Sequence, residues 1–373
     1  MARMPVSTGR RTLLKGLAAA MLLPSRGWAA AGAPAWVAAA KRADGSHALH
    51  GIAASGDLLF AVPLPDRGHA AAAHPDRAEA VAFARRPGIF GIVLDCRDGS
   101  VIRRLTPPEG RQFNGHGAFS LDGRVLYTSE VVAEGSAGRV GLWDAAGSYA
   151  RLGEWDSGGI GPHELRVDAG GRIVVANGGI ETDPTDRTPL NLDRMQPNLT
   201  VLDASGAILS QRALGAGLHQ NSIRHLALIP GGTAFAMQWQ GEPTEPVPLL
   251  GLAPDDAPDS TSTNAPLTAC PAPEAEAFLM QGYAGSIAAN PAAGLIALTS
   301  PRGGVAMIHD LTGAHRATLR RPDLCGAAMA EDAAFTLTDG GGAIWAADPD
   351  TGLRLRARHE VAWDNHLVSV AGV

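Results

Sequence analysis

The chain has 373 residues, 45% of them hydrophobic, and a formal net charge of −6 at pH 7. This length and apolar content support a substantial core in one large domain or two small ones. No block of lysine or arginine offsets the acidic balance, so the sequence excludes electrostatic binding to nucleic acid. We expect no nucleotide cofactor.

The N-terminus carries the features of an export signal. The motif "TGRRTLLKG" is followed by a short apolar run and a small-residue stretch, as in Tat signal peptides. We predict that residues 1–33 are removed, with cleavage after Ala31 or Ala33. A membrane anchor is the alternative, but the apolar run is far shorter than the ~20 residues that span a bilayer, and no later segment could cross. The protein is therefore expected to be periplasmic and exported in its folded state.

The remainder, residues 34–373, is expected to form a single all-β domain. Glycine (46) and proline (26) are abundant, and no long helical stripe of apolar residues follows the signal. Short apolar runs such as "GRVLYTSE" and "GLIALTSP" alternate with "DG", "GG" and "SG" turns. Such spacing calls for a search for internal repeats.

Seven similar units recur along this domain: "RGHAAAAHPD", "NGHGAFSLDG", "GPHELRVDAG", "IRHLALIPGG", "AGSIAANPAA", "LCGAAMAEDA" and "DNHLVSVAGV". Their anchor positions are 69, 116, 163, 225, about 286, about 326 and 366. Most steps between anchors are 40 to 47 residues, the length of a four-stranded propeller blade. The longer steps contain two predicted insertions, residues 178–197 and 240–275.

In this arrangement the first and last predicted strands belong to the same blade. The seventh unit has only its first strand, His366 to Val370, whereas three strand-like runs precede the first anchor: "AWVAAAKR", "ALHGIAA" and "DLLFAVPLP". A blade of one C-terminal and three N-terminal strands leaves no open sheet edge. We predict a seven-bladed β-propeller closed in this way. A pair of β-sandwiches is the alternative, because turn spacing alone fits both.

Histidine occupies five of the seven anchors, although only 12 of the 373 residues are histidine. The first strand of a propeller blade is the innermost, so these side chains should ring the mouth of the central channel. Converging neutral imidazoles favour a transition metal between them, and iron or copper fits best. The candidate ligands are His69, His116, His163, His225 and His366.

Two other interpretations of these histidines stay open. In WD-type propellers a Gly-His dipeptide ties each blade down, and "NGH" with "LWD" in the second unit is typical of that arrangement. However, "WD" occurs in this place only once, and the histidines lie close to the turn that ends the inner strand. The third interpretation is a neutral core histidine with satisfied hydrogen bonds.

Four residues beside the anchors are further candidates. Cys325 offers a soft ligand or is an inert buried thiol. Glu164 would either ligate the metal or orient an imidazole. Arg224 and Asn365, each directly before an anchor histidine, suit an anionic ligand or substrate.

The second strand of each blade should end beside the histidines. The predicted insertions 178–197 and 240–275 leave from such ends and are expected to cover the channel mouth as a lid. The polar residues at these ends are Arg85, Arg86, Glu130, Asn177, Gln238, Arg302 and Asp339.

The three cysteines, Cys96, Cys270 and Cys325, allow at most one internal disulfide in a compartment where disulfides form. They do not form a haem-attachment or zinc-ribbon motif.

Several longer motifs resemble a family of Tat-exported periplasmic propellers of unknown function. They are "GHGAFSLDG", "GIGPHE", "VANGGI", "LNLDRMQPNL", "HQNSIRHLA", "GYAGSIA" and the terminal "DNH". The resemblance runs from about residue 35 to the end. Genes of that family often accompany imelysin-type iron-uptake proteins and di-haem peroxidase-like proteins, so the resemblance implies a link to iron acquisition and imelysin-type partners.

Three functions follow from these features. The favoured one is a periplasmic protein that handles or senses a transition metal without catalysis. A metal-dependent lactonase- or esterase-like hydrolase is the second, although such propellers favour carboxylate ligands around calcium and the sequence lacks "GxSxG". The third is a metal-free platform for protein interactions.

Overall fold

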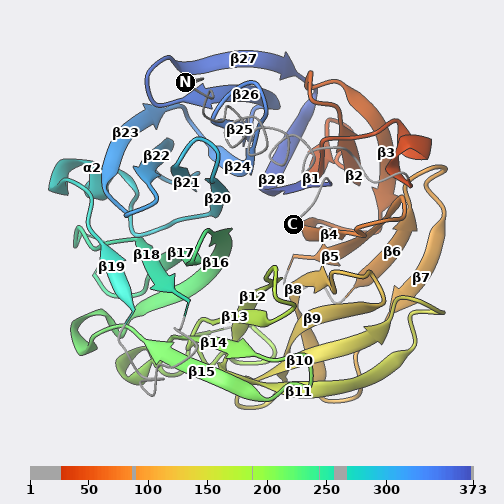
Figure 1. Cartoon of the computed structure of the whole chain (residues 1–373), viewed down its shortest axis with the longest axis horizontal. Coiled ribbons are helices and arrows are strands. Elements are labelled where there is room, and N and C mark those ends of the chain that lie inside the picture. The colour runs from red at the N-terminus through yellow and green to blue at the C-terminus, as the bar shows by residue number, and fades with distance from the viewer. Residues whose placement is uncertain (1–26, 86–89, 187, 243, 256–266, 371–373) are drawn as a thin grey trace, which may run out of the picture.

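The computed structural model describes residues 27–85, 90–186, 188–242, 244–255 and 267–370. In this part of the chain seven antiparallel four-stranded sheets surround a central channel (Figure 1). The predicted seven-bladed β-propeller is confirmed, and the pair of β-sandwiches is wrong.

Each blade runs from an innermost to an outermost strand. Blade 1 contains β4 (Gly68–Ala73), β5 (Glu79–Ala84), β6 (Gly91–Asp95) and β7 (Val101–Leu105). Blade 2 contains β8 (Arg111–Phe119), β9 (Val125–Val132), β10 (Ala137–Asp144) and β11 (Arg151–Ile160). Blade 3 contains β12 (Pro162–Val167), β13 (Ile173–Asn177), β14 (Asn198–Leu202) and β15 (Ile208–Ala213). Blade 4 contains β16 (Asn221–Ile229), β17 (Gly232–Trp239), β18 (Leu250–Pro254) and β19 (Thr268–Cys270).

Blade 5 contains β20 (Ser286–Asn290), β21 (Leu295–Ser300), β22 (Val305–Asp310) and β23 (His315–Arg320). Blade 6 contains β24 (Leu324–Met329), β25 (Phe335–Asp339), β26 (Ala343–Asp348) and β27 (Gly352–Arg358). Blade 7 contains β28 (Val361–Ser369), β1 (Trp36–Arg42), β2 (His47–Ile52) and β3 (Leu58–Leu64). The short helices are η1 (Trp28–Ala31), η2 (Leu192–Arg194), η3 (Ala216–Leu218) and α2 (Glu274–Leu279).

Blade 7 joins the two ends of the chain as predicted. The C-terminal strand β28 pairs with β1, so that Trp36 lies opposite Ser369 and Val37 opposite Val368. The ladder continues from β1 to β2 and from β2 to β3. These backbone hydrogen bonds hold the ring closed.

The burial of the strands follows their distance from the channel. Strands β6 and β13 are buried along their whole length, because neighbouring blades cover both faces of each sheet. Outermost strands such as β7 expose most of their side chains. The apolar runs recognised in the sequence are therefore mostly inner and middle strands, and the small residues of β4, "GHAAAA", suit the crowded centre.

One predicted insertion needs correction. Residues 240–275 contain β18 and β19, which are the third and fourth strands of blade 4. The strands were hidden because both are short and lie among proline-rich connections. By contrast, residues 178–197 do lie between two strands of blade 3, and they include η2 and an isolated bridge between Thr182 and Pro189.

The described residues begin within the predicted signal peptide. Residues 1–26, with the twin arginines, lie outside the described part. Trp28 in η1 is fully buried in a core cluster with Val37 and Leu49. None of the helices in the described ranges has the length and apolarity needed to span a bilayer.

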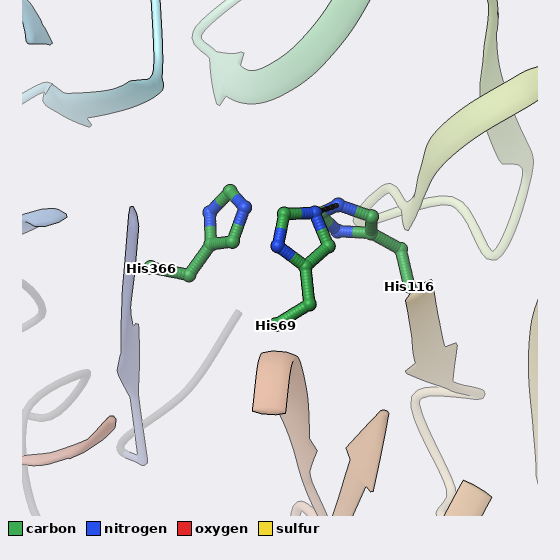
Figure 2. Close-up of side chains that lie close together, drawn as sticks. All are labelled: His69, His116 and His366. Carbon is green, nitrogen blue, oxygen red and sulfur yellow. Dashed lines mark hydrogen bonds between the residues drawn. The ribbon is translucent and has the colours of Figure 1, made fainter. Parts of the chain in front are cut away.

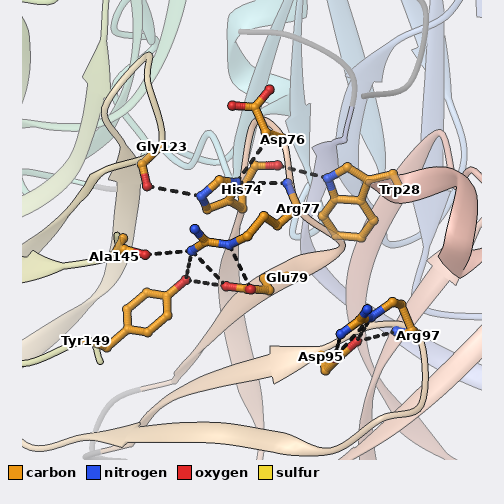
Figure 3. A network of polar contacts seen from close by, with 10 residues as sticks. All are labelled: Trp28, His74, Asp76, Arg77, Glu79, Asp95, Arg97, Gly123, Ala145 and Tyr149. Carbon is orange, nitrogen blue, oxygen red and sulfur yellow. Dashed lines mark hydrogen bonds and ion pairs between the residues drawn. The ribbon is translucent and has the colours of Figure 1, made fainter. Parts of the chain in front are cut away.

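A polar network ties η1 to blades 1 and 2 (Figure 3). Nε1 of Trp28 donates to the carbonyl of His74, which follows β4. Nδ1 of His74 accepts from the backbone N–H groups of Asp76 and Arg77, so its Nε2–H donates to the carbonyl of Gly123 in blade 2. His74, which lies outside the anchor positions, is thus a structural histidine that bridges two blades.

Cys96, Cys270 and Cys325 are all buried and free. The disulfide that the sequence allowed is not formed between them.

Candidate metal centre

The five anchor histidines come together in the central channel. His69, His116, His163, His225 and His366 lie on β4, β8, β12, β16 and β28, which are innermost strands. Each residue is at most 9% exposed. The anchors of blades 5 and 6 are Ser286 and Gly326, so the imidazoles come from five blades.

Local irregularity of the inner strands turns these side chains toward the channel. In all five blades that carry a histidine, the pairing register between the inner strand and its neighbour shifts at the anchor. The shifts lie between Gly68 and Ala71, between Phe113 and Gly117, between Pro162 and Leu165, between Ile223 and His225, and, in blade 7, opposite Ala38 to Ala40 of β1. A β-bulge of this kind re-aims a side chain. Of the two blades without a histidine, blade 5 pairs without a shift, whereas blade 6 shifts between Leu324 and Ala327, so the bulge is a feature of most anchors and not of the histidines alone.

The distances between the rings fit metal ligation. His69, His116 and His366 form one group and His116, His163 and His225 another, and within each group the candidate ligand atoms lie within 4.8 Å of one another. Figure 2 shows the first group converging from three strands. Two nitrogen ligands of one metal, each at about 2.1 Å, lie up to about 4.2 Å apart. Three tetrahedral ligands lie only about 3.4 Å apart, so a bound ion requires some of these ligand atoms to move closer by up to about 1.5 Å.

One pair already has the separation of adjacent ligands. Nε2 of His69 lies 3.2 Å from Nε2 of His116, and two ligands at right angles on one metal lie about 3 Å apart. Among the described residues no hydrogen-bond partner reaches the buried Nε2 of His366, and the buried Nδ1 of His69 faces Oδ1 of Asp364 at 3.9 Å, beyond hydrogen-bond distance. Buried ring nitrogens without partners fit a site that binds a cation.

Burial keeps these rings neutral and able to ligate. The pKa of each of the five imidazoles is lowered from the ordinary value of 6.5, mainly by the cost of burying the charged form. The charges that neighbouring imidazolium ions would carry lower the pKa of His163 and His366 further. At neutral pH the group therefore offers lone pairs to a metal.

Glu164 orients one of these imidazoles. Nδ1 of His225 lies 3.1 Å from Oε2 of Glu164, which also accepts from the backbone N–H of Leu226. Oε1 lies 2.6 Å from Nη2 of Arg166. Burial opposes ionisation of Glu164, but Arg166 and His225 outweigh it and lower the pKa to about 2. With Nδ1–H donating to a carboxylate, the Nε2 lone pair of His225 is free.

Asp364 is a further candidate residue of the site, which the sequence patterns did not single out. It lies next to the "NH" of the last anchor, and Oδ1 is 3.9 Å from Nδ1 of His69. Oδ2 lies 2.5 Å from Nε of Arg67, and Oδ1 lies 3.2 Å from Nη1 of Arg85. These cations and His69 lower the pKa of Asp364 although burial opposes ionisation. The sequence motif "DNH" could have pointed to Asp364, because an acidic residue two positions from a ligand can orient a neighbouring imidazole.

A pocket of about 490 Å³ opens above the histidines. His69, His163 and His225 form part of its wall, together with polar residues from several blades. Further along the channel, His116, His225 and His366 line a small cavity of about 30 Å³. The cluster thus separates the two spaces, and a bound metal would be reached from the larger one.

The other candidates lie at different places. Arg224 and Asn365 line the pocket, and Nδ2 of Asn365 donates to the hydroxyl of Tyr283. Sγ of Cys325 instead contacts the carbonyl oxygens of Thr338 and Trp363, and it belongs to neither histidine group. Burial raises the pKa of Cys325 to about 12.

The polar ends of the second strands divide into two sets. Arg85, Gln238 and Arg302 line the pocket, as do Gly178, Ile180, Thr182 and Pro189 of the 178–197 segment. Of the other described ends, Glu130 bonds Arg151 and Asp339 bonds Trp345 within their own blades, whereas Asn177 of blade 3 bonds Ser157 of blade 2. Arg86 lies outside the described residues.

Solved structures share the fold at low sequence identity. A chain of hydrazine synthase from Kuenenia stuttgartiensis aligns with a TM-score of 0.57 and 14% identity, covering 84% of this chain and 89% of that one. The WD40 repeats of RRP9 align with a TM-score of 0.53 and 12% identity, covering 91% and 92%. U3-55K gives a TM-score of 0.50 and 12% identity, covering 90% and 92%. These likenesses establish the propeller architecture alone.

No curated protein matches the sequence. The profile of one family, described as "Protein of unknown function (DUF1513)", matches residues 62–370. This match spans the strands that carry all five histidines. The chain belongs to the DUF1513 family.

Proposed function

We propose that this protein binds a transition metal ion, iron or copper, through the histidine cluster in its central channel. The observation that carries the proposal is the convergence of five buried, neutral imidazoles from five blades on one place. Imidazole nitrogen is a preferred ligand of iron, copper, nickel and zinc, whereas calcium and magnesium prefer oxygen. The donor set therefore supports a transition metal over the calcium of a lactonase-like hydrolase.

The cluster also differs from a set of blade tethers. A tether would hydrogen-bond the backbone of its own blade or of the next one, as His74 does at the Gly123 carbonyl, whereas the ring hydrogen bonds of His69 and His225 go to the side chains of His116 and Glu164. The anchor histidines instead face one another, with ring centroids 4.7 to 4.8 Å apart between His69 and His366 and between His163 and His225. This arrangement supports ligands over tethers.

We propose a role in periplasmic metal handling, with export in the folded state by the Tat pathway. The twin-arginine motif supports the route, and the resemblance to propellers encoded beside imelysin-type proteins supports iron acquisition and such proteins as partners. A folded protein loaded with metal before export would fit this route.

Metal analysis of protein purified after native export tests the proposal. We expect about one transition metal ion per chain, and the double variant His163→Ala/His225→Ala should lose it. The matched control is His315→Ala, because His315 lies on the outer strand β23, where its ring contacts Thr318 and His309 instead of the cluster. Stoichiometric calcium would favour the hydrolase, and absence of any metal would favour the interaction platform.

The same variants show whether the histidines act as metal ligands or as tethers between blades. If the histidines are ligands, the thermal unfolding of the metal-free double variant should match that of the metal-free wild type closely. A loss of several kcal/mol in the metal-free state would support the tether.

A further inference from the structure

The pocket above the histidine cluster has an excess of positive charge. Four arginines line it, whereas Asp323 is the only carboxylate in its described wall. Asp364, behind this wall, pairs with two of the arginines and so neutralises one of their charges. The four arginines are Arg67, Arg85, Arg224 and Arg302.

Arg302 is the most available of these cations. Its guanidinium carbon lies 4.7 Å from the centroid of the Tyr283 ring, a cation–π contact. No carboxylate in the described ranges forms an ion pair with it. The contact with Tyr283 holds the guanidinium at the pocket wall, where it can pair with an anion.

The arginines stand on opposite sides of the channel. Arg67 and Arg85 flank the inner strands of blade 1, whereas Arg224 lies on β16 of blade 4 and Arg302 follows β21 of blade 5. In the seven-bladed ring, blades 4 and 5 lie across the channel from blade 1 (Figure 1). An anion with several separated charges can pair with arginines on both sides, and the arrangement fits such a ligand.

A metal ion bound in the histidine cluster would add to the positive charge that an anion in the pocket could balance. The five imidazoles are neutral, and both nearby buried carboxylates are already paired, Glu164 with Arg166 and Asp364 with Arg67. A divalent cation in the cluster would therefore face the arginines without a compensating charge. An anion bound between the metal and the arginines would offset the repulsion between them.

We propose that the pocket binds a small polycarboxylate, which pairs with arginines on both sides and places one carboxylate oxygen on the metal. The metal contact rests on the proposed function, whereas the arginine contacts do not. Arginine pairs with phosphate as well as with carboxylate, but the separation of these arginines across the channel favours an anion whose charges are spread over several groups.

Titration of the metal-free protein with citrate at constant ionic strength tests the arginine contacts. We expect saturable binding to the wild type and much weaker binding of acetate, which carries one carboxylate. Arg302→Gln should lower the citrate affinity about tenfold or more, the usual effect of losing a hydrogen bond to a charged group. Arg104→Gln, the same change on the exposed outer strand β7, should leave it unchanged.

Three results would overturn this assignment: no citrate binding, equal binding to the Arg302→Gln variant, or tighter binding of inorganic phosphate than of citrate. If the protein binds no metal but the metal-free form binds citrate as expected, the proposed function fails and the arginine pocket stands.

The copper-loaded protein tests the metal contact. Citrate should change the electron paramagnetic resonance spectrum of protein-bound Cu²⁺, and copper should stay with the protein through gel filtration. An unchanged spectrum at saturating citrate, or removal of the copper by citrate, would contradict ligation of the metal by the bound anion.

Discussion

Gly115 lies against the imidazole of His69, so closely that a Cβ at Gly115 would stand 2.8 Å from Cδ2 of the ring. The glycine also has a φ of +93°, a conformation that other residues rarely adopt. The backbone of blade 2 thus helps to set the position of a side chain from blade 1.

We expect Gly115→Ala to weaken metal binding by pushing the His69 ring away from His116. The matched control is Gly110→Ala, because Gly110 has a φ of +72° with no atom near its absent Cβ. Both variants should lose about 1 kcal/mol or more of stability through backbone strain. Metal dissociation constants, measured by chelator competition, should rise only for Gly115→Ala, and equal values would contradict the contact.

A second prediction concerns the carboxylate that orients His225. Glu164→Gln removes the charge while keeping the size of the side chain, so the ring loses its charge-assisted hydrogen bond. Metal affinity should fall about 10- to 100-fold, the usual effect of altering such a partner. Glu154→Gln, which alters a partly exposed ion pair with Arg111 in blade 2, is the control and should leave the affinity unchanged. Equal affinities of the two variants would show that Glu164 has no part in the site.

A third prediction concerns pH and His50, which lies outside the cluster. His50 is 2% exposed, neither ring nitrogen has a hydrogen-bond partner among the described residues, and its ring packs against Trp363. Burial, with smaller effects of Arg42 and His359, lowers the pKa of His50 from 6.5 to about 4. The unfolded chain therefore binds a proton that the folded chain rejects, and stability falls as the pH drops below about 6.5.

This group should contribute about 2 kcal/mol of the stability lost between pH 7 and pH 5. His50→Phe keeps a ring and removes the titration, so urea unfolding of this variant should lose about that much less than wild type over the same interval. His50→Leu serves as a second variant if phenylalanine fits poorly. Identical pH dependence in wild type and both variants would mean that His50 does not titrate in this way.

A fourth prediction concerns Trp28 at the start of the described chain. Trp28→Ala should lower the free energy of unfolding of the full chain by about 3–5 kcal/mol, because a fully buried ring is lost. Trp28→Phe keeps most of the packing and loses the bond to the His74 carbonyl, so it should cost less. Neither variant should alter metal affinity. The mass of the exported protein would show whether cleavage after Ala31 or Ala33 removes this contact.

The sequence predicted the architecture because each blade repeats one local pattern. Strand length, turn residues and the position of the anchor recur in every unit, so the ring and its closure by β28 and β1 followed from counting strands. The strands β18 and β19 were missed because their proline-rich surroundings resemble an insertion. Convergence of the histidines was predictable for the same reason, since equivalent positions in a propeller face one axis.

The rest of the site depends on contacts between blades, which no repeat encodes. Asp364 has no counterpart in the other units, and its pairing with Arg67 joins residues 297 apart in the sequence. Cys325 stood at a repeat position but contacts backbone oxygen atoms instead of the cluster. The register shifts that aim the histidines also depend on the pairing of whole strands, which a motif of ten residues does not reveal.

The placement of His366 on β28 sets an order of events during biosynthesis. The cluster takes its other four imidazoles from earlier strands, but the fifth, with Asp364 and Asn365, emerges from the ribosome after them. A growing chain can therefore assemble six blades and still lack one of the five proposed ligands. If the cluster binds a metal as proposed, full loading requires that β28 has been synthesised and has paired with β1, so metal retention would distinguish chains with a closed ring from truncated ones.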